Sequence, residues 1–257
     1  MSFVVAPDSY DRFMGRYSGP LATLFADFAG IAAPMDVLDV GSGPGALTKE
    51  LVSRLDNGSI SAVDPSDPFV SAIRERFPSV AVEQASAEHL PFRDESFDVT
   101  MAQLVVHHMT DPVAGVAEMG RVTRSDGVVA ACVWDFAGDR SPLSPYWRAV
   151  KRFDPESTGE SELAGAKEGD LTRIFDEAGL GDVSETAIAF EVTHESFEEW
   201  WEPFALGVGP AGRHLAQLSS EDRDRVAAWC RQEVPDPPFT LDIAVWAARG
   251  RPAPQTV

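Results

Sequence analysis

Short apolar runs and longer amphipathic segments alternate along the first half of the chain. The apolar runs are rich in β-branched residues and fall at 35–40, 59–63, 80–85, 97–106 and 127–134. Helix-like segments lie between them at 45–56, 67–77 and 111–123. Runs that are almost continuously apolar are typical of parallel strands buried on both faces. The pattern therefore predicts an α/β fold with helices on both faces of a mostly parallel sheet.

The second half keeps this alternation but interrupts it twice. Residues 136–169 are rich in Pro, Gly, Ser and charge, and residues 195–238 form an irregular, partly helical stretch. Between them, an amphipathic segment at 170–180 contains Gly179, which is expected to stop a helix at its C-terminal end. Strands are predicted at 187–193 and 239–249.

We therefore expect one domain over 1–257, Rossmann-like and doubly wound. The two interruptions are expected to be helical insertions that form a lid on the substrate side. Residues 1–30 are expected to form an N-terminal helical cap, and residues 251–257 a loose tail.

Composition narrows the classes of partner. The 257 residues include 41 acidic and 21 basic side chains, a formal charge of −20, which disfavours nucleic acid and anionic membrane surfaces. Cys132 and Cys230 stand apart from other metal-ligating residues, so we expect buried thiols and neither a disulfide nor a metal site. The sequence shows no basic-then-apolar leader and no run of about 18 apolar residues, so we expect a soluble, cytoplasmic protein.

The stretch VLDVGSGPGALT places glycines 41, 43 and 45 where the first strand gives way to a helix. Ligands of open parallel sheets bind at the carboxyl ends of strands. Glycine has no Cβ, so a ligand can approach the backbone there, and it adopts φ values barred to other residues. The alternative is a tight turn with no ligand.

An acidic residue supports the ligand hypothesis. Asp64 ends the second apolar run about 20 residues beyond the loop, the distance at which a carboxylate meets the two hydroxyls of a ribose. Nicotinamide enzymes share this spacing, and a helix N-cap is the alternative role. The glycine pattern is G-x-G-x-G with Asp39 ahead of it, whereas a dinucleotide loop has G-x-G-x-x-G beside a pyrophosphate. A carboxylate there suits an ammonium group and a sulfonium better.

In these motifs the chain resembles the class I S-adenosylmethionine-dependent methyltransferases, in the small-molecule branch that includes ubiquinone- and menaquinone-biosynthesis enzymes. VLDVGSGPGALT is similar to their first motif and AVDPS to their second. ASAEHLPFRDESFDVTMAQLVVHHMTDP resembles the segment that runs into their fourth strand, and YDRFMGRYSGPLA resembles an N-terminal helix that closes over the cofactor. The resemblance implies a seven-stranded sheet with an antiparallel last strand.

The resemblance also implies binding residues for S-adenosylmethionine. They are Asp39, Gly41, Ser42, Gly43 and Gly45 at the methionine part, Asp64 at the ribose, Pro65, Ser66, Ser86, Ala87 and Glu88 around the adenine, and Gln103 near the amino group and the methyl. Ser86 stands where the family often has Asp, and a hydroxyl is a weaker acceptor than a carboxylate. Arg16 and Tyr17 are expected to reach the cofactor carboxylate; a solvated arginine and a core tyrosine are the alternative.

Methyl transfer is an in-line displacement at an activated carbon, so alignment and exclusion of water can supply much of the acceleration. A general base is optional. His108 is the preferred candidate and His107 the second, because both follow the fourth strand and an ordinary histidine pKa near 6.5 suits proton transfer near neutral pH. The alternative is that one histidine packs in the core and the other hydrogen-bonds to the backbone. Asp135 is a lesser candidate.

Six aromatic residues would suit an apolar or planar small-molecule acceptor under the lid. They are Trp134, Tyr146, Trp147, Trp200, Trp201 and Phe204. Two other functions stay open. A nicotinamide-dependent oxidoreductase is disfavoured by the glycine spacing and by the lack of a Tyr-x-x-x-Lys pair, and a non-catalytic binder of S-adenosylmethionine would lack an acceptor that turns over.

Overall fold

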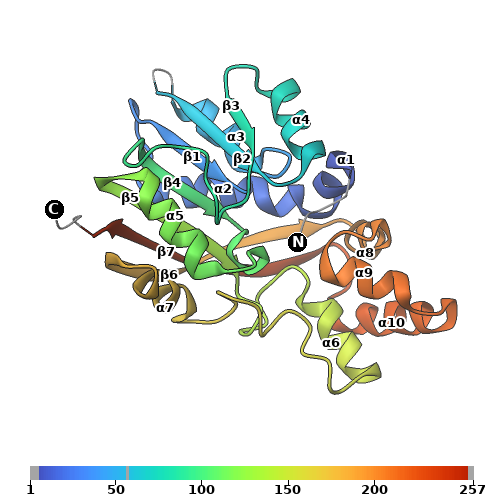
Figure 1. Cartoon of the computed structure of the whole chain (residues 1–257). Coiled ribbons are helices and arrows are strands. Elements are labelled where there is room, and N and C mark those ends of the chain that lie inside the picture. The colour runs from blue at the N-terminus through green and yellow to red at the C-terminus, as the bar shows by residue number, and fades with distance from the viewer. Residues whose placement is uncertain (1–5, 56–57, 254–257) are drawn as a thin grey trace.

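A computed structural model describes residues 6–55 and 58–253. Within these ranges, seven strands form one sheet in the order β3-β2-β1-β4-β5-β7-β6 (Figure 1). Their bounds are β1 Val37–Val40, β2 Ile60–Asp64, β3 Ala81–Gln84, β4 Phe97–Gln103, β5 Thr123–Trp134, β6 Leu180–His194 and β7 Phe239–Pro252.

The helices that surround the sheet fall into an N-terminal group, a group between strands and a group in the two insertions. They are α1 Pro7–Tyr10, η1 Asp11–Gly15 and α2 Arg16–Ala29, then α3 Ala46–Arg54, α4 Asp67–Arg76, η2 Val106–His108, α5 Pro112–Val122 and α7 Asp170–Glu177, and finally α6 Ser144–Phe153, α8 Phe197–Trp201, η3 Glu202–Leu206, α9 Gly209–Gln217 and α10 Ser220–Glu233. Figure 1 shows α2 and α5 on opposite faces of the sheet.

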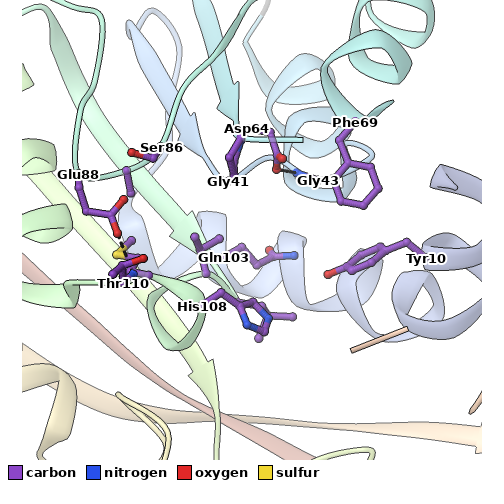
Figure 2. Close-up of a pocket in the computed structure, with 15 residues that line it drawn as sticks. Tyr10, Gly41, Gly43, Asp64, Phe69, Ser86, Glu88, Gln103, His108 and Thr110 are labelled. Atoms are coloured by element: carbon purple, nitrogen blue, oxygen red, sulfur yellow. Dashed lines mark hydrogen bonds between the residues drawn. The ribbon is translucent and has the colours of Figure 1, made fainter. Parts of the chain in front are cut away.

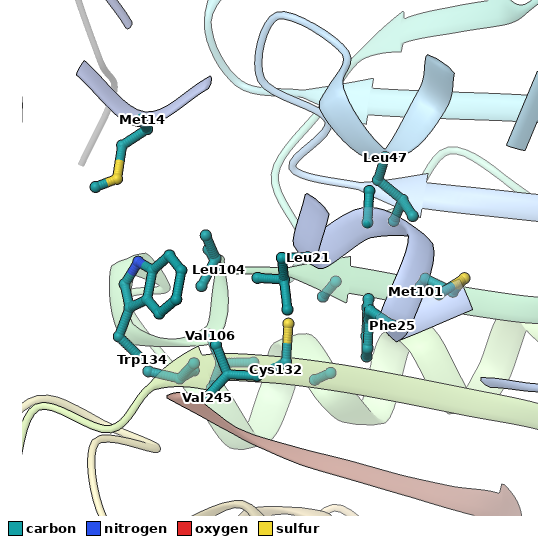
Figure 3. Packing of buried hydrophobic residues seen from close by; sticks show 14 of the residues in the cluster. Met14, Leu21, Phe25, Leu47, Met101, Leu104, Val106, Cys132, Trp134 and Val245 are labelled. Carbon is teal, nitrogen blue, oxygen red and sulfur yellow. The ribbon is translucent and has the colours of Figure 1, made fainter. Parts of the chain in front are cut away.

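The sheet confirms the predicted α/β, Rossmann-like fold. Strands β1 to β5 pair in parallel, and β7 runs antiparallel to both β5 and β6. All four residues of β1 are buried, as expected for a central strand covered on both faces. The apolar face of α2 packs on this centre, where Leu21 and Phe25 lie close to Met101 and Cys132 (Figure 3). Full burial of a Leu, Phe or Met side chain stabilises the folded state by about 1.5–3 kcal/mol.

Strand β6 is longer than the sequence pattern predicted. It begins at Leu180, seven residues before the predicted start, and pairs with β7 as far as Pro252. Its early part carries a register shift between Gly181 and Ser184, with Asp182 at φ 51°, so the apolar alternation is broken there. Gly179, at φ 80°, follows the end of α7 as predicted.

The two insertions pack against each other beyond the carboxyl ends of β5 and β6. Helix α6, from the first insertion, contacts α10 from the second (Figure 1). Arg148 Nε donates to Glu233 Oε2 at 2.8 Å, and the rings of Tyr146 and Phe204 stack at 4.9 Å. The insertions therefore form one helical body at the end of the sheet.

The chain ends differ in detail from the prediction. Helices α1, η1 and α2 fill the described part of the predicted cap, residues 6–30. Arg251 and Pro252, assigned to the tail, are instead paired with β6, because the long hairpin continues past Gly250. Residues 1–5 and 254–257 of these two predictions lie outside the described ranges. None of the described helices combines the length and apolar character needed to span a lipid bilayer.

Candidate functional site

A cavity of about 160 Å³ lies at the carboxyl ends of β1, β2 and β4 (Figure 2). It is lined by Tyr10, Gly41, Gly43, Asp64, Pro65, Phe69, Ser86, Ala87, Glu88, Gln103, Leu104, Val105, His108, Met109 and Thr110. Nine of these residues belong to the predicted site: Gly41, Gly43, Asp64, Pro65, Ser86, Ala87, Glu88, Gln103 and His108.

The glycine loop wraps over the end of β2. The N–H groups of Gly41 and Ser42 both donate to the carbonyl of Val63, at 2.8 and 3.0 Å. Glycines 41, 43 and 45 all have positive φ, at 69°, 53° and 105°, which L residues adopt only with strain. The loop is therefore held in a shape that requires glycine.

A Cβ atom added at each of the three glycines would meet different surroundings. A Cβ on Gly41 would lie 2.6 Å from Val105, and one on Gly45 would lie 2.6 Å from the Phe77 ring. A Cβ on Gly43 would meet nothing within 4 Å, and Gly43 lines the cavity. Gly43 therefore leaves open space at the cavity, whereas Gly45, which does not line the cavity, makes room for Phe77 and Ile73.

Asp64 is fixed by the loop and points toward it in Figure 2. Its Oδ2 accepts from Gly43 N at 2.9 Å, and its Oδ1 accepts from Ser66 N at 2.8 Å. The side chain is buried, which raises the pKa of its carboxyl, although the two backbone donors act in the opposite direction. Each oxygen keeps a lone pair for a ligand hydroxyl. Ser66 itself does not line the cavity.

Asp39, in β1, and Ser42, in the loop, both lie outside the cavity lining. Asp39 Oδ2 accepts from Thr48 Oγ1 at 2.6 Å, and burial raises the pKa of Asp39 to about 7. The Ser42 hydroxyl is buried without a hydrogen-bond partner in the described chain. Thr48 is in α3, so Asp39 joins the end of β1 to the following helix. This placement differs from the predicted contact of Asp39 with the methionine part.

Glu88 connects two walls of the cavity. Its Oε1 accepts from the backbone N–H of Thr110 at 2.8 Å and of Asp111 at 3.4 Å. Partial burial would raise the pKa of Glu88, but these backbone donors and Ser86 lower it. The segment after β3 is thereby tied to the segment after β4. Ser86 and Ala87 complete this wall.

Gln103 presents an acceptor without a partner. Its Nε2 donates to the carbonyl of Ser18 at 3.0 Å, which ties the end of β4 to α2. Its Oε1 is buried and has no hydrogen-bond partner in the described part of the chain. A buried amide oxygen left unpaired is costly, so this atom suits a ligand donor.

A second, narrow cavity, of about 30 Å³, adjoins the first. Tyr10, Leu104 and His108 line both. The rest of its lining is mainly apolar and comes from the N-terminal segment, the end of β5 and both insertions: Phe13, Met14, His107, Trp134, Phe136, Leu143, Glu160, Val208, Gly209 and Pro210. Figure 3 shows Met14, Trp134 and Leu104 at this end of the core.

Comparison with known proteins agrees with this geometry. Residues 38–131 match the family described as "Methyltransferase domain". An uncharacterised methyltransferase of Mycobacterium tuberculosis is 36% identical over 142 residues, which are 54% of this chain and 54% of that protein. The chain thus spans about half the length of this relative. A demethylmenaquinone methyltransferase of Roseiflexus castenholzii is 32% identical over 60% of this chain and 72% of its own length.

The chain belongs to the S-adenosylmethionine-dependent methyltransferases. Its fold agrees with this family. A putative methyltransferase from an antibiotic biosynthesis pathway of Anabaena variabilis superposes with a TM-score of 0.61 at 16% identity, covering 90% of this chain and 96% of that one.

The first cavity of this methyltransferase fits S-adenosylmethionine on three observations. Asp64 offers paired acceptors for a ribose, Gly43 leaves open space beside the loop, and Gln103 Oε1 is an unpaired acceptor for an ammonium group. The family's cofactor therefore matches the side chains that are present.

Arg16 and Tyr17 of the methyltransferase lie away from this cavity. Arg16 donates from Nη1 to His194 Nδ1 at 2.7 Å and pairs with Glu199 at 2.5 Å. The Tyr17 hydroxyl bonds His194 Nε2 at 3.1 Å, and Tyr17 is buried. The two residues thus tie α2 to β6 and α8, so the alternative of a core tyrosine is correct. Instead of these two residues, Tyr10, six residues before Arg16, lines the cavity.

The two histidines differ from ordinary histidines in their pKa. Burial lowers the pKa of His108 to about 4, and burial together with His108 holds the pKa of His107 well below its usual value. Their rings lie 3.9 Å apart, and His107 Nδ1 has no hydrogen-bond partner among the described residues. Both are therefore neutral at pH 7, which differs from the expected pKa near 6.5.

Asp135, the lesser candidate for a base, and five of the six aromatic residues proposed for the acceptor site contact other parts of the chain instead. Asp135 accepts from Gly138 N at 2.8 Å and Arg140 Nε at 2.7 Å, so it holds a turn after β5 and lines neither cavity. Of the six aromatic candidates, Trp134 lines the second cavity. The other five, Tyr146, Trp147, Trp200, Trp201 and Phe204, pack with each other in the insertions.

Sequence reasoning missed several lining residues. Leu104, Val105, Met109 and Thr110 directly follow Gln103, so adjacency to the end of the fourth strand was a usable signal. Tyr10 begins the segment that resembles a helix closing over the cofactor, so that resemblance was a usable signal. Phe69, whose ring meets the Tyr10 ring edge to face at 5.5 Å, had no signal beyond its place in a predicted helix. No cluster of three or more His, Cys, Asp or Glu side chains in the described ranges is arranged to hold a metal ion.

Proposed function

We propose that this methyltransferase transfers a methyl group from S-adenosylmethionine to a small-molecule acceptor that is mainly apolar or planar. The observation that carries the proposal is the pair of adjoining cavities that share Tyr10, Leu104 and His108. The first has nucleoside-binding groups and the second has apolar and aromatic walls. An acceptor in the second cavity would meet the cofactor at this shared boundary.

When bound, S-adenosylmethionine supplies a methyl carbon already activated by a sulfonium. The chain contributes position and exclusion of water. Asp64 would hold the ribose hydroxyls, and Gln103 Oε1 would accept from the ammonium group. Phe13, Leu143 and Val208 come from the N-terminal segment and the two insertions, and they line the second cavity. This supports the proposed role of these segments as cap and lid, because water would be displaced from between the two reactants.

The test of this function is a binding and turnover experiment. S-adenosylmethionine and S-adenosylhomocysteine are expected to bind in calorimetry, whereas NAD and NADP are not. Radiolabelled methyl transfer to at least one member of a panel of quinols, phenols and amines is then expected. Binding of dinucleotides alone would favour an oxidoreductase, and cofactor binding without any turnover would favour a non-catalytic binder.

His108 is proposed as a general base for acceptors that must lose a proton, with His107 as its neighbour. Replacing His108 with alanine is expected to lower kcat by about 10²-fold, the low end of the range for a positioned base, because a histidine with a pKa of about 4 is a weaker base than one tuned to the working pH. Because the pKa of His108 is about 4, the side chain can accept a proton at any pH above that value. The wild-type rate is therefore expected to stay level from pH 8 to about 5 and to fall as pH drops through 4.

The control for this prediction is His89→Ala, which removes an exposed histidine outside both cavities. It should leave kcat unchanged, and both variants should bind S-adenosylhomocysteine as the wild type does. A wild-type rate that falls through pH 6.5, or a His108 variant with normal kcat on a hydroxyl acceptor, would remove His108 from this role.

The proposal places the reaction in the cytoplasm, supported by the buried free thiols of Cys132 and Cys230. The charge of −20 supports a small-molecule partner over nucleic acid.

A further inference from the structure

The second cavity contains one buried carboxylate. Glu160 lies in the first insertion, between α6 and α7, and its side chain is 3% exposed. It lines the second cavity and not the first, and it also borders a third hollow that Arg148 and Lys151 line. A buried carboxylate is costly unless its charge is compensated, so its surroundings indicate what it is kept for.

The chain holds Glu160 in place with little compensation for its charge. Its Oε2 accepts from Trp147 Nε1 at 2.8 Å. The preceding residue, Gly159, has φ 58°, and a Cβ there would lie 2.7 Å from the Trp147 ring, so the backbone packs closely on the same indole. Burial raises the pKa of Glu160 to about 7, against the smaller effects of Trp147 and Arg213. The carboxylate therefore has acceptor positions left for a ligand.

The other walls of this cavity suit a cation. Phe13, Trp134 and Phe136 contribute aromatic rings, whose faces attract ammonium groups. Its lining among the described residues includes no lysine or arginine, and both lining histidines are neutral at pH 7. The nearby charge of Arg213 acts on Glu160 and His108, but Arg213 does not line the cavity. The molecule as a whole carries a charge of −20, which attracts cations and repels anions.

The geometry points to Glu160 as the specificity-determining residue for an acceptor that carries an ammonium group on an otherwise apolar body. This inference rests on the proposed function and adds the chemical class of the acceptor. Because Glu160 does not line the cofactor cavity, the ammonium group binds away from the methylated atom. The reacting end of the acceptor lies instead at the boundary formed by Tyr10, Leu104 and His108.

The test measures equilibrium binding of three probes of similar size: 2-phenylethylamine, 2-phenylethanol and 3-phenylpropionate. Each is titrated into the protein saturated with S-adenosylhomocysteine. The amine is expected to bind about tenfold or more tightly than the alcohol, since a charged partner strengthens a hydrogen bond to a buried carboxylate. The carboxylate probe is expected to bind weakest.

Two variants separate recognition from structure. Glu160→Gln keeps the shape and an acceptor oxygen for Trp147 but loses the charge, so it should weaken amine binding by about tenfold or more while leaving the alcohol within about twofold. Glu162→Gln, two residues along the same loop and exposed, is the matched control and should leave all three probes unchanged. Unchanged affinity for S-adenosylhomocysteine shows that each variant is folded.

Three results would overturn the inference: equal binding of amine and alcohol, an unchanged amine affinity in Glu160→Gln, or no binding of any probe to protein that holds S-adenosylhomocysteine. The proposed function is judged separately, by S-adenosylhomocysteine binding alone and by methyl transfer. If methyl transfer fails, the comparison of amine and alcohol is still made on protein that holds S-adenosylhomocysteine. If S-adenosylhomocysteine does not bind, the proposed function fails, and the same three probes are titrated into the free protein.

Discussion

Replacing Gly43 with valine is expected to abolish measurable cofactor binding, with an affinity loss of at least about 100-fold. The Cβ position of Gly43 meets nothing within 4 Å and Gly43 lines the first cavity, so a branched side chain would occupy space needed by the ligand. The φ of 53° would also strain a β-branched residue. Calorimetric titration with S-adenosylhomocysteine measures the loss.

Gly30→Val is the matched control for this substitution. Gly30 ends α2 with φ 75°, and its Cβ position is also open within 4 Å, but it lies outside both cavities. Both variants should therefore lose similar thermal stability, and Gly30→Val should bind the cofactor normally. If Gly43→Val also binds normally, the loop is a turn that the ligand does not touch.

Replacing Asp64 with alanine is expected to weaken cofactor binding by about 2–4 kcal/mol, or about 30- to 1000-fold, through loss of two hydrogen bonds to the ribose hydroxyls. The same change leaves the N–H groups of Gly43 and Ser66 without their acceptor, so the melting temperature should fall as well. Affinity is measured well below the melting transition to keep the two effects apart.

Asp67→Ala removes an exposed carboxylate three residues away, at the start of α4. It controls for a general loss of negative charge near the loop and should leave cofactor affinity within about twofold. If Asp64→Ala lowers the melting temperature but leaves the affinity intact, Asp64 acts only as a turn residue.

The sheet could be predicted because its central strands are buried on both faces. Val37 to Val40 are apolar except for Asp39. Such a run is typical of a strand that pairs on both sides and is covered on both faces, as β1 is in the structure. The early half of β6 could not be predicted this way. Gly181, Asp182 and Ser184 are poor strand formers, and pairing with β7 holds this segment in the sheet.

The cofactor side of the site could be predicted because its residues directly follow strands. Gly43, Asp64 and Gln103 all lie at strand ends that meet on one edge of the sheet. The roles of Arg16 and Tyr17 could not be predicted, because their partner His194 is 178 and 177 residues away along the chain. Glu160 had no signal either, since it stands in an irregular segment without periodicity.

The family match covers residues 38–131, whereas most walls of the second cavity lie outside that stretch. Phe13 and Met14 precede it, and Trp134, Glu160 and Val208 follow it. On the proposed function, the stretch that matches the family carries the cofactor loop, and the acceptor is selected mostly by residues outside that stretch. Such a division means that substitutions in the N-terminal segment and the insertions can change the acceptor while the residues of the cofactor loop stay as they are.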